Sequence, residues 1–308
     1  MDKILCDAVF EGGGMRGIGH VGAIAKLEES GYGFRRVAGS SSGAIVASLL
    51  AAGFNASELH EIMASLNFEK FKERGGRFNF GALGKIISTT RNFGIYSADL
   101  FERWFSEILA RKGVRTFADV GDRLKVIASD ITDSQILVLP DDLTKFGINP
   151  DAFSIATAVR MSMSIPIFYE PYELRDAEDN VHLIVDGGIL SNYPVWIFDD
   201  GKSVPDIPCF GFRFQRSTPS KTRLDFTTYI KQLIHTVMDD DDIYLSKLRG
   251  DKQRTIFIPV NVGDRTVNAT DFDMPLYEIN AMYNNGFQAA TEFLKNWNFD
   301  DWRREFSV

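Results

Sequence analysis

The order of apolar and glycine-rich segments in the first 53 residues constrains the fold of this chain more than any other feature. A short apolar run over residues 4–10 is typical of a buried strand, and a glycine-rich loop over 12–17 follows it. Apolar residues then recur at helical spacing over 18–30. A second strand leads through a tight turn at 39–43 into an apolar helix. This alternation of strands and helices predicts an α/β fold with a mostly parallel central sheet.

The rest of the chain continues this pattern without an internal repeat or a low-complexity linker. We therefore interpret residues 1–308 as one domain. Further strands are expected at 124–128, 135–139, 182–185, 208–214 and 255–259. Further helices are expected at 57–66 with Ser57 as N-cap, from Ser97 to Gly113, and at 154–163, 226–249 and 276–296.

Composition places the chain among ordinary globular proteins. Its 308 residues are 44% hydrophobic and 25% charged, which is enough to build a sizeable core. The net charge of −8 offers no general electrostatic attraction for nucleic acid, so we expect no nucleic-acid partner. The two distant cysteines, Cys6 and Cys209, form neither a disulfide framework nor a zinc pattern, so we expect no metal site.

Neither a signal peptide nor a membrane span is expected. The apolar stretch at the N-terminus is short, is broken by Asp7 and runs into the glycine loop. No window reaches the roughly 18–20 apolar residues that a bilayer-spanning helix needs. These features predict a cytoplasmic protein whose contact with a membrane, if any, is peripheral.

The segment Gly39-Ser40-Ser41-Ser42-Gly43, between the second strand and the following helix, carries the first chemical signal. In a nucleophile elbow a strained turn projects its central serine, and small residues two positions to either side let strand and helix pass closely. The helix that follows points its N-terminal N–H groups at the site. Ser41 is therefore the candidate nucleophile, with Gly39 and Gly43 as its flanking residues. A plain turn between strand and helix is the alternative.

The glycine loop Gly12-Gly13-Gly14-Met15-Arg16-Gly17 can present backbone N–H groups unobstructed by side chains, so it could bind a phosphate or act as an oxyanion hole. Gly12, Gly14 and Gly17 also match the dinucleotide fingerprint G-x-G-x-x-G. That motif requires an acidic residue about 20 positions later to hold the ribose. The second strand instead ends at Val37-Ala38-Gly39, which disfavours dinucleotide binding. A P-loop is excluded because no Lys-Ser/Thr pair follows, while a purely structural loop stays open.

Asp186-Gly187-Gly188 follows the predicted strand 182–185 and supplies a carboxylate at a strand end. Open α/β sheets place their sites at that edge. Asp130 and Asp133, after the predicted strand 124–128, are similar candidates. A turn-forming aspartate is the ordinary explanation for each of the three.

The four histidines argue against a Ser-His-Asp triad. An α/β-hydrolase triad runs in the chain order Ser, Asp or Glu, His. His235 is the only histidine after Asp186, and it lies inside a predicted long helix where that fold has a loop. We expect His20 to support the core or the glycine loop, and His60 and His182 to be surface or strand residues. If no histidine serves, the base must be a carboxylate.

Together these residues resemble the patatin-like phospholipase family. The resemblance rests on the glycine loop with its Arg and Gly, on the elbow and on the Asp-Gly-Gly turn, all in family order. The segments Val159–Pro166 and Asn192-Tyr193-Pro194 are also similar to the family. The match covers residues 4–215, and residues 216–308 are expected to complete the fold with helices and a strand.

The sequence departs from the family in two places. Glu11 stands where plant members usually have Asp, and residues 68–96 match no familiar segment. The latter are aromatic and basic, so they could form a membrane-facing lid or a loop-rich cap with core phenylalanines.

The resemblance implies a three-layer α/β/α fold with a catalytic Ser–Asp dyad and no cofactor. Ser41 would attack the acyl carbonyl, and Asp186 would accept its proton. The remaining implied site residues are the oxyanion donors Gly12, Gly13 and Gly14, the loop supports Arg16 and Gly17, and the base-turn residues Gly187 and Gly188.

The resemblance also implies acyl esters of lipids as substrates, chiefly phospholipids or lysophospholipids. Two alternatives stay open. One is an esterase or thioesterase acting on small soluble acyl substrates. The other is a phospholipase effector gated by a ligand or partner that the C-terminal third senses.

Overall fold

The structure is a computed structural model that describes residues 3–66, 73–74, 93–199, 205–215, 236, 249–269, 271 and 273–306. Its strands are β1 (Ile4–Phe10), β2 (Tyr32–Ser40), β3 (Glu73–Arg74), β4 (Gly94–Ser97), β5 (Leu124–Asp130), β6 (Gln135–Leu139), β7 (Ile167–Tyr169), β8 (Tyr172–Arg175), β9 (Val181–Asp186), β10 (Cys209–Phe214), β11 (Thr255–Ile258), β12 (Asn261–Val262) and β13 (Arg265–Thr266).

The described α-helices are α1 (Ile18–Glu29), α2 (Ser42–Ala51), α3 (Ala56–Ser65), α5 (Asp99–Ala110), α6 (Ile155–Ser162), α9 (Arg249–Gln253), α10 (Leu276–Asn296) and α11 (Phe299–Phe306). Short 3₁₀ turns include η1 (Gly14–Gly17), η6 (Gly187–Ile189) and η7 (Val195–Phe198). Among the described residues, no helix is long and apolar enough to cross a membrane.

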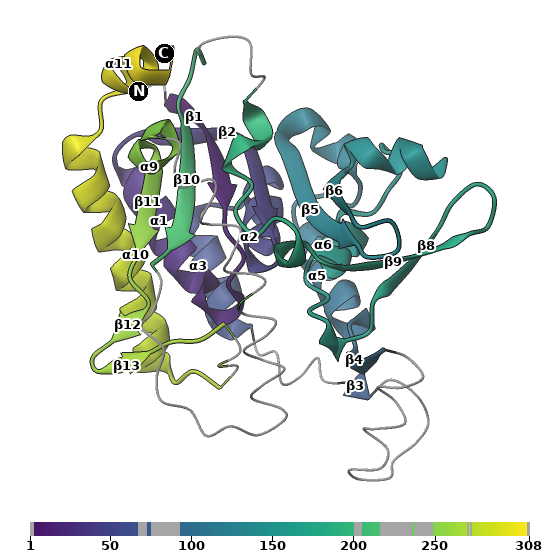
Figure 1. The fold of residues 1–308 in the computed structure, drawn as a ribbon. Coiled ribbons are helices and arrows are strands. Elements are labelled where there is room, and N and C mark those ends of the chain that lie inside the picture. Colours follow the sequence, from purple (N-terminus) through teal and green to yellow (C-terminus); the bar gives the residue numbers. More distant parts are fainter. Residues whose placement is uncertain are drawn as a thin grey trace.

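An eight-stranded sheet forms the centre of the molecule (Figure 1). Its order is β11-β10-β1-β2-β5-β9-β8, and β6 also pairs with β5. The first five strands of that order run parallel to one another. β6 and β9 pair with β5 in the antiparallel sense, and β8 pairs with β9 in the same way. The predicted α/β fold with a mostly parallel central sheet is confirmed.

One edge of β5 is shared by two strands that run in opposite directions. β2 pairs with the first half of β5 in parallel and ends with Ser40 opposite Ile127. β9 continues along β5 in the antiparallel sense and ends with Asp186 opposite Ala128. β6 pairs with the same residues of β5 as β9 does, so β6 occupies the other edge. The C-terminal ends of β2 and β9 therefore meet head to head at neighbouring positions of β5.

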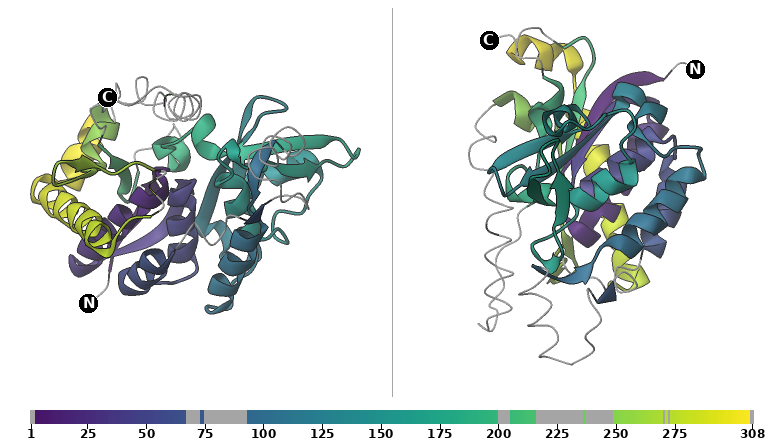
Figure 2. Two further views of the ribbon diagram at one scale, coloured as in Figure 1. Left: turned by 90° about the horizontal axis from the view of Figure 1, so that it is seen from below. Right: turned by 90° about the vertical axis from the view of Figure 1, so that its right-hand side faces the viewer.

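Successive side chains of the strands point to opposite faces and form two apolar clusters. The larger one packs the sheet against α1, α2, α3, α5, α6 and α10, which lie together on one side of it (Figure 2). The smaller one joins Val9, Ala38 and Cys209 to Ile197 and Phe198 of η7 on the other side. The first strands of the chain are thus covered on both faces, as their continuous apolar sequences predict.

The C-terminal region joins this core through glycines. A Cβ at Gly286 of α10 would lie 1.8 Å from the carbonyl oxygen of Gly19, and one at Gly22 would lie 1.9 Å from that of Tyr283. Only glycine permits the backbones of α1 and α10 to approach so closely. In the same region β11 extends the sheet beyond β10.

Most predicted elements appear near their expected bounds, but two predicted helix starts are wrong. The N-cap of α3 is Asn55 and not Ser57: the Asn55 side chain accepts from the Glu58 N–H, and the Glu58 side chain accepts from the Asn55 N–H. Ser97 belongs to β4, and α5 begins at Asp99. Apart from a few residues, the predicted helix 226–249 and the segment 68–96 lie outside the described residues.

Candidate active site

Ser41 occupies a strained turn between β2 and α2. Its backbone has φ 53° and ψ −125°, a left-handed conformation that costs a non-glycine residue on the order of 1–3 kcal/mol. A Cβ at Gly39 would lie 2.3 Å from the carbonyl carbon of Gly43, and one at Gly43 would lie 2.2 Å from the carbonyl oxygen of Phe10. The two glycines thus let the turn close, which is the geometry of a nucleophile elbow.

Asp186 lies directly against Ser41. The Ser41 hydroxyl donates to Oδ2 of Asp186 at 2.7 Å, and the Gly188 N–H donates to Oδ1 at 2.8 Å. Both acidic and hydroxyl side chains are buried, with Ser41 3% and Asp186 0% exposed. Burial raises the pKa of Asp186 to about 7, against the smaller lowering effects of the hydrogen bonds from Ser41 and Gly188. A carboxylate in this state can take up a proton near neutral pH.

The head-to-head meeting of β2 and β9 on β5 brings these two side chains together. Ser41 follows the last residue of β2, and Asp186 is the last residue of β9. A Cβ at Gly187 would lie 2.3 Å from the Ile127 carbonyl oxygen and 2.5 Å from the Ser40 hydroxyl. The glycine after Asp186 is therefore required for the chain to turn away within this crowded junction.

The three consecutive glycines of the loop after β1 differ in what their N–H groups contact. Gly12 N–H donates to the Asn192 carbonyl at 3.1 Å, and Gly13 N–H donates to the Ser42 hydroxyl at 3.0 Å. Within the described part of the chain, the Gly14 N–H donates no hydrogen bond. Gly14 has φ 54°, and a Cβ there would lie 2.0 Å from the Ala269 carbonyl oxygen. The three predicted donors are therefore not equivalent: the N–H groups of Gly12 and Gly13 already donate to Asn192 and Ser42.

Arg16 and His20 contact the backbone carbonyls of Gly13 and Glu11 in the same loop. The Arg16 Nε donates to the Gly13 carbonyl at 3.2 Å, and its guanidinium lies 5.0 Å from the ring centre of Phe214. The Nε2 of His20 lies 2.9 Å from the Glu11 carbonyl, and its ring lies tilted against that of Phe214 with centres 4.3 Å apart. Burial lowers the pKa of His20 to about 3, so its imidazole is neutral. Both residues contact the loop and not Ser41, as a supporting role requires.

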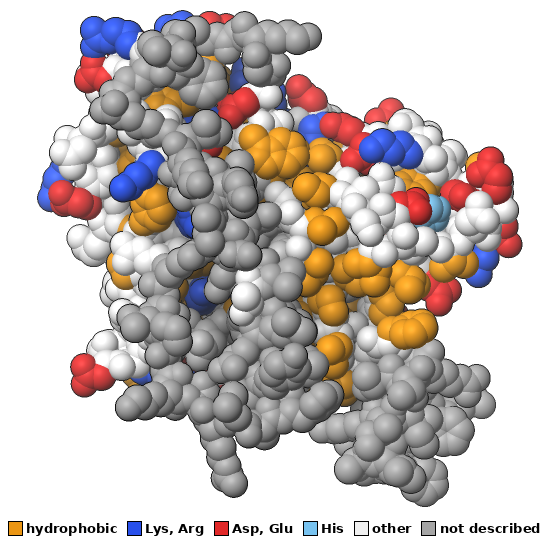
Figure 3. All heavy atoms as spheres, in the orientation of Figure 1, with side chains coloured by type: hydrophobic (Ala, Val, Ile, Leu, Met, Phe, Trp, Pro, Cys, Tyr) orange, Lys and Arg blue, Asp and Glu red, His pale blue; other side chains and the backbone are white. Residues whose placement is uncertain are grey.

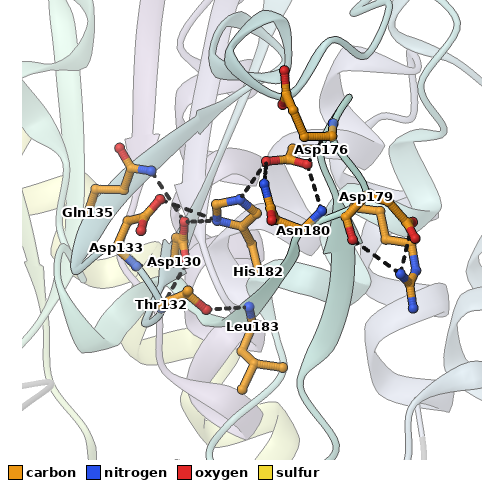
Figure 4. Close-up of polar contacts among 11 residues, drawn as sticks. Asp130, Thr132, Asp133, Gln135, Asp176, Asp179, Asn180, His182 and Leu183 are labelled. Atoms are coloured by element: carbon orange, nitrogen blue, oxygen red, sulfur yellow. Dashed lines mark hydrogen bonds and ion pairs between the residues drawn. The ribbon is translucent and has the colours of Figure 1, made fainter.

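Asp130 and Asp133 point toward His182 (Figure 4). The Nδ1 of His182 lies 3.1 Å from Asp130 and 3.3 Å from Asp133, and its Nε2 lies 3.6 Å from Asp176. The ligand atoms of Asp130, Asp133 and His182 lie within 4.8 Å of one another, so they could hold a metal ion. These same atoms also satisfy one another as hydrogen-bonded ion pairs.

The other histidines are placed away from the pair or fall outside the description. His60 packs edge-on against Tyr283, with ring centres 4.8 Å apart. His235 lies outside the described residues. Of the candidate bases that the sequence offers, the structure places Asp186 against Ser41.

Comparison with known proteins decides the family. The patatin-like phospholipase model matches residues 8–199. The chain belongs to the patatin-like phospholipase family. It is therefore one of the carboxylic ester hydrolases. Over 296 residues it is 38% identical to the uncharacterized protein YqhO of Bacillus subtilis, which covers 95% of this chain and 99% of that protein. It is 25% identical over 198 residues to the probable lipid hydrolase 463L of Invertebrate iridescent virus 6, with 61% of each chain covered.

Two solved structures share the fold of this patatin-like chain. VipD from Legionella pneumophila superposes with a TM-score of 0.55 at 18% identity, over 96% of this chain and 67% of that one. The type III effector protein ExoU superposes with a TM-score of 0.53 at 14% identity, over 96% and 53%. At these identities the likeness concerns the fold alone.

Three polar residues around the elbow make contacts that the sequence did not predict. The Ser42 hydroxyl and the Asn192 carbonyl hold the glycine loop, and the Ser162 hydroxyl accepts from the Ser41 N–H at 2.8 Å. The family-like segments around Asn192 and Ser162 drew attention to these positions without assigning them a role. Their contacts join residues far apart in the sequence, which no local pattern reports.

Proposed function

We propose that this chain is a serine acyl-ester hydrolase of the phospholipase A or lysophospholipase type that releases fatty acid from membrane glycerolipids. The observation that carries the proposal is the 2.7 Å hydrogen bond from the Ser41 hydroxyl to the Asp186 carboxylate. A nucleophile bonded to a base with a pKa of about 7 can lose its proton at neutral pH as it attacks. Membership of the family and the name of the viral relative support a lipid ester as the substrate.

The proposed reaction has two halves. Ser41 Oγ attacks the acyl carbonyl carbon while its proton passes to Asp186, and the carbonyl oxygen takes the negative charge. The intermediate collapses as Asp186 gives the proton to the leaving alcohol oxygen, so that an ester on Ser41 remains. Water then attacks that ester and gives a proton to Asp186. The fatty acid leaves when Ser41 Oγ recovers the proton.

The glycine loop stabilises the negative charge in this proposal. Gly14 N–H is the first donor because it has no partner among the described residues, and Gly13 N–H becomes the second when it leaves the Ser42 hydroxyl. Each such donor contributes about 3 kcal/mol to the stabilisation of the transition state. Gly12, held by Asn192, anchors the loop, and Arg16 and Gly17 support it from behind.

Contact with the lipid surface is peripheral in this proposal, and exposed apolar side chains support it. Figure 3 shows hydrophobic side chains gathered in a band across one face of the molecule. Exposed large apolar residues include Trp196 of η7 at 36%, Phe93 at 59%, and Leu276 and Tyr277 at 70% and 66%. Such side chains favour insertion into an interface over exposure to water.

Labelling and lipid profiling test the proposal together. A fluorophosphonate followed by mass mapping identifies the nucleophile, and vesicles of phospholipid or lysophospholipid report the released fatty acid. We expect the label on Ser41, fatty acid from the vesicles, and the loss of both in Ser41→Ala. A label on another serine would contradict the nucleophile, and turnover of short-chain esters with none on vesicles would contradict the lipid substrate.

A further inference from the structure

Residues 162–164, where α6 ends, contact the backbone of both Ser41 and Asp186. The Ser162 hydroxyl accepts a hydrogen bond from the Ser41 N–H at 2.8 Å. The Ser164 carbonyl accepts one from the Asp186 N–H at 2.9 Å. Both partners of the Ser41–Asp186 hydrogen bond thus rest on positions two residues apart in the chain. We propose that Ser162 is a positioning residue that sets the geometry of this pair, an inference that rests on the proposed function.

The Ser162 hydroxyl joins three elements at one point. It is fully buried, and it donates its own proton to the Ile127 carbonyl of β5 at 2.5 Å. A hydroxyl has a single proton, so the atom facing Ser41 N–H presents a lone pair only. One side chain of α6 therefore links β5 to the elbow, donating to β5 and accepting from the elbow.

The sheet ladder alone does not set the distance between the two side chains. β2 and β9 each pair with β5 and meet end to end along one of its edges, and among the described strands no pairing joins β2 to β9. Ser162 makes its contact at Ile127, the residue opposite the last residue of β2. Together with the Ser164 carbonyl, it joins the elbow after β2 and the last residue of β9 to the same end of α6.

The Ser162 hydroxyl also helps to hold the strained backbone conformation of Ser41. A residue at φ 53° keeps that conformation only where its surroundings hold it. Removing the Ser162 hydroxyl leaves the Ser41 N–H and the Ile127 carbonyl without that partner in a buried site. Without that hydrogen bond the backbone of Ser41 can leave its strained conformation, and Ser41 Oγ then moves away from Asp186.

Ser162→Ala and Ser48→Ala form a matched pair for the test. Both remove a fully buried serine hydroxyl, but the Ser48 hydroxyl, on α2 after the elbow, has no hydrogen-bond partner among the described residues. We expect Ser162→Ala to lower both kcat and the rate of fluorophosphonate labelling at Ser41 by about tenfold or more, with KM within about twofold. Ser48→Ala should stay within about twofold in all three quantities. Amide hydrogen exchange at Ser41 should be faster in Ser162→Ala alone.

Ser162→Cys decides the question if the alanine variant does not fold. The thiol preserves the approximate size but accepts hydrogen bonds weakly, so kcat and the labelling rate should again fall while KM holds. Wild-type kcat and labelling in the Ser162 variants, with both abolished in Ser41→Ala, would overturn the positioning role and leave the proposed function intact. Full hydrolysis by Ser41→Ala would overturn the proposed function and the positioning role with it.

Discussion

A buried carboxylate lies at each end of β9, Asp186 of β9 itself and Asp130 of the neighbouring β5, and their surroundings differ. At the C-terminal end of β9, Asp186 accepts from the Ser41 hydroxyl and the Gly188 N–H, and burial raises its pKa to about 7. At its start, His182 lies between three carboxylates, and Asp130 among them is as fully buried as Asp186. Asp130 accepts from two backbone N–H groups, from the Gln135 amide and from the His182 ring (Figure 4).

This difference teaches that burial alone does not make an aspartate a base. Hydrogen-bond donors stabilise a carboxylate in its charged form, and their scarcity leaves burial to favour the neutral form. Asp130 accepts four hydrogen bonds and ties the turn after β5 to the start of β9. Asp186 accepts two from the described residues, one on each oxygen, and burial outweighs them in raising its pKa.

Matched amide substitutions at Asp186 and Asp130 should affect different quantities, activity in the first case and stability in the second. We expect Asp186→Asn to lower kcat by about 10³-fold, since an amide cannot accept the Ser41 proton. We expect Asp130→Asn to change kcat less than tenfold but to lower the free energy of unfolding by about 1–3 kcal/mol, because a new amide group then faces the Gln135 and His182 donors. Enzyme assays and denaturant unfolding of both variants check this. Equal losses of activity would contradict the division of roles.

The pH dependence should follow Asp186. The base must be ionised in the free enzyme, so kcat/KM should rise with pH and level off above about 7. Stability should move the opposite way: because folding raises the pKa, the folded state binds more protons, and stability from this group is present below about pH 4 and lost as pH rises to about 7.

The same linkage predicts a gain of stability in the inactive variant. At pH 8 Asp186→Asn should be more stable than wild type by on the order of 4 kcal/mol, and at pH 4 the difference should nearly vanish. Thermal unfolding at the two pH values measures it. A variant less stable than wild type at pH 8 would show that the buried charge is compensated.

A smaller effect is expected at the other end of β9. Burial alone would lower the pKa of His182, but the hydrogen bond and charge of Asp130, with Asp176 and Asp133, raise it overall. Stability from His182 is therefore present at pH 6 and lost as pH rises through the raised pKa. His182→Asn should cost about 1 kcal/mol at pH 6 and less at pH 9, with the pH profile of kcat/KM unchanged. A shifted kcat/KM profile would couple the two ends.

The smallest effect is expected at His235, which lies outside the described residues. If Asp186 is the base, His235→Ala should leave kcat within about twofold of wild type. Loss of activity in that variant would replace the dyad with a triad and remove the contrast between Asp186 and the histidine-bound carboxylates.

Local patterns predicted the elements that depend on neighbours in the chain. The apolar run of β1 and the helix expected at 276–296, which is α10, appear with the bounds that the sequence indicates. Small residues around Ser41 predicted the elbow, because the crowding there is between adjacent strand and helix. The start of α3 was misplaced because Asn55 caps better than Ser57 through its reciprocal bonds with Glu58.

The sequence by itself determined the α/β class, the elbow and the glycine loop, since each follows from residues close together in the chain. It left Asp130, Asp133 and Asp186 alike as strand-end acids, and only the resemblance favoured one of them. The tertiary structure alone separated them. Ser41 and Asp186 are 145 positions apart, and they meet because β9 runs antiparallel along the part of the β5 edge that lies beyond the end of β2. Strand direction and register are long-range choices, set by packing and pairing across the whole sheet, so no local pattern encodes them.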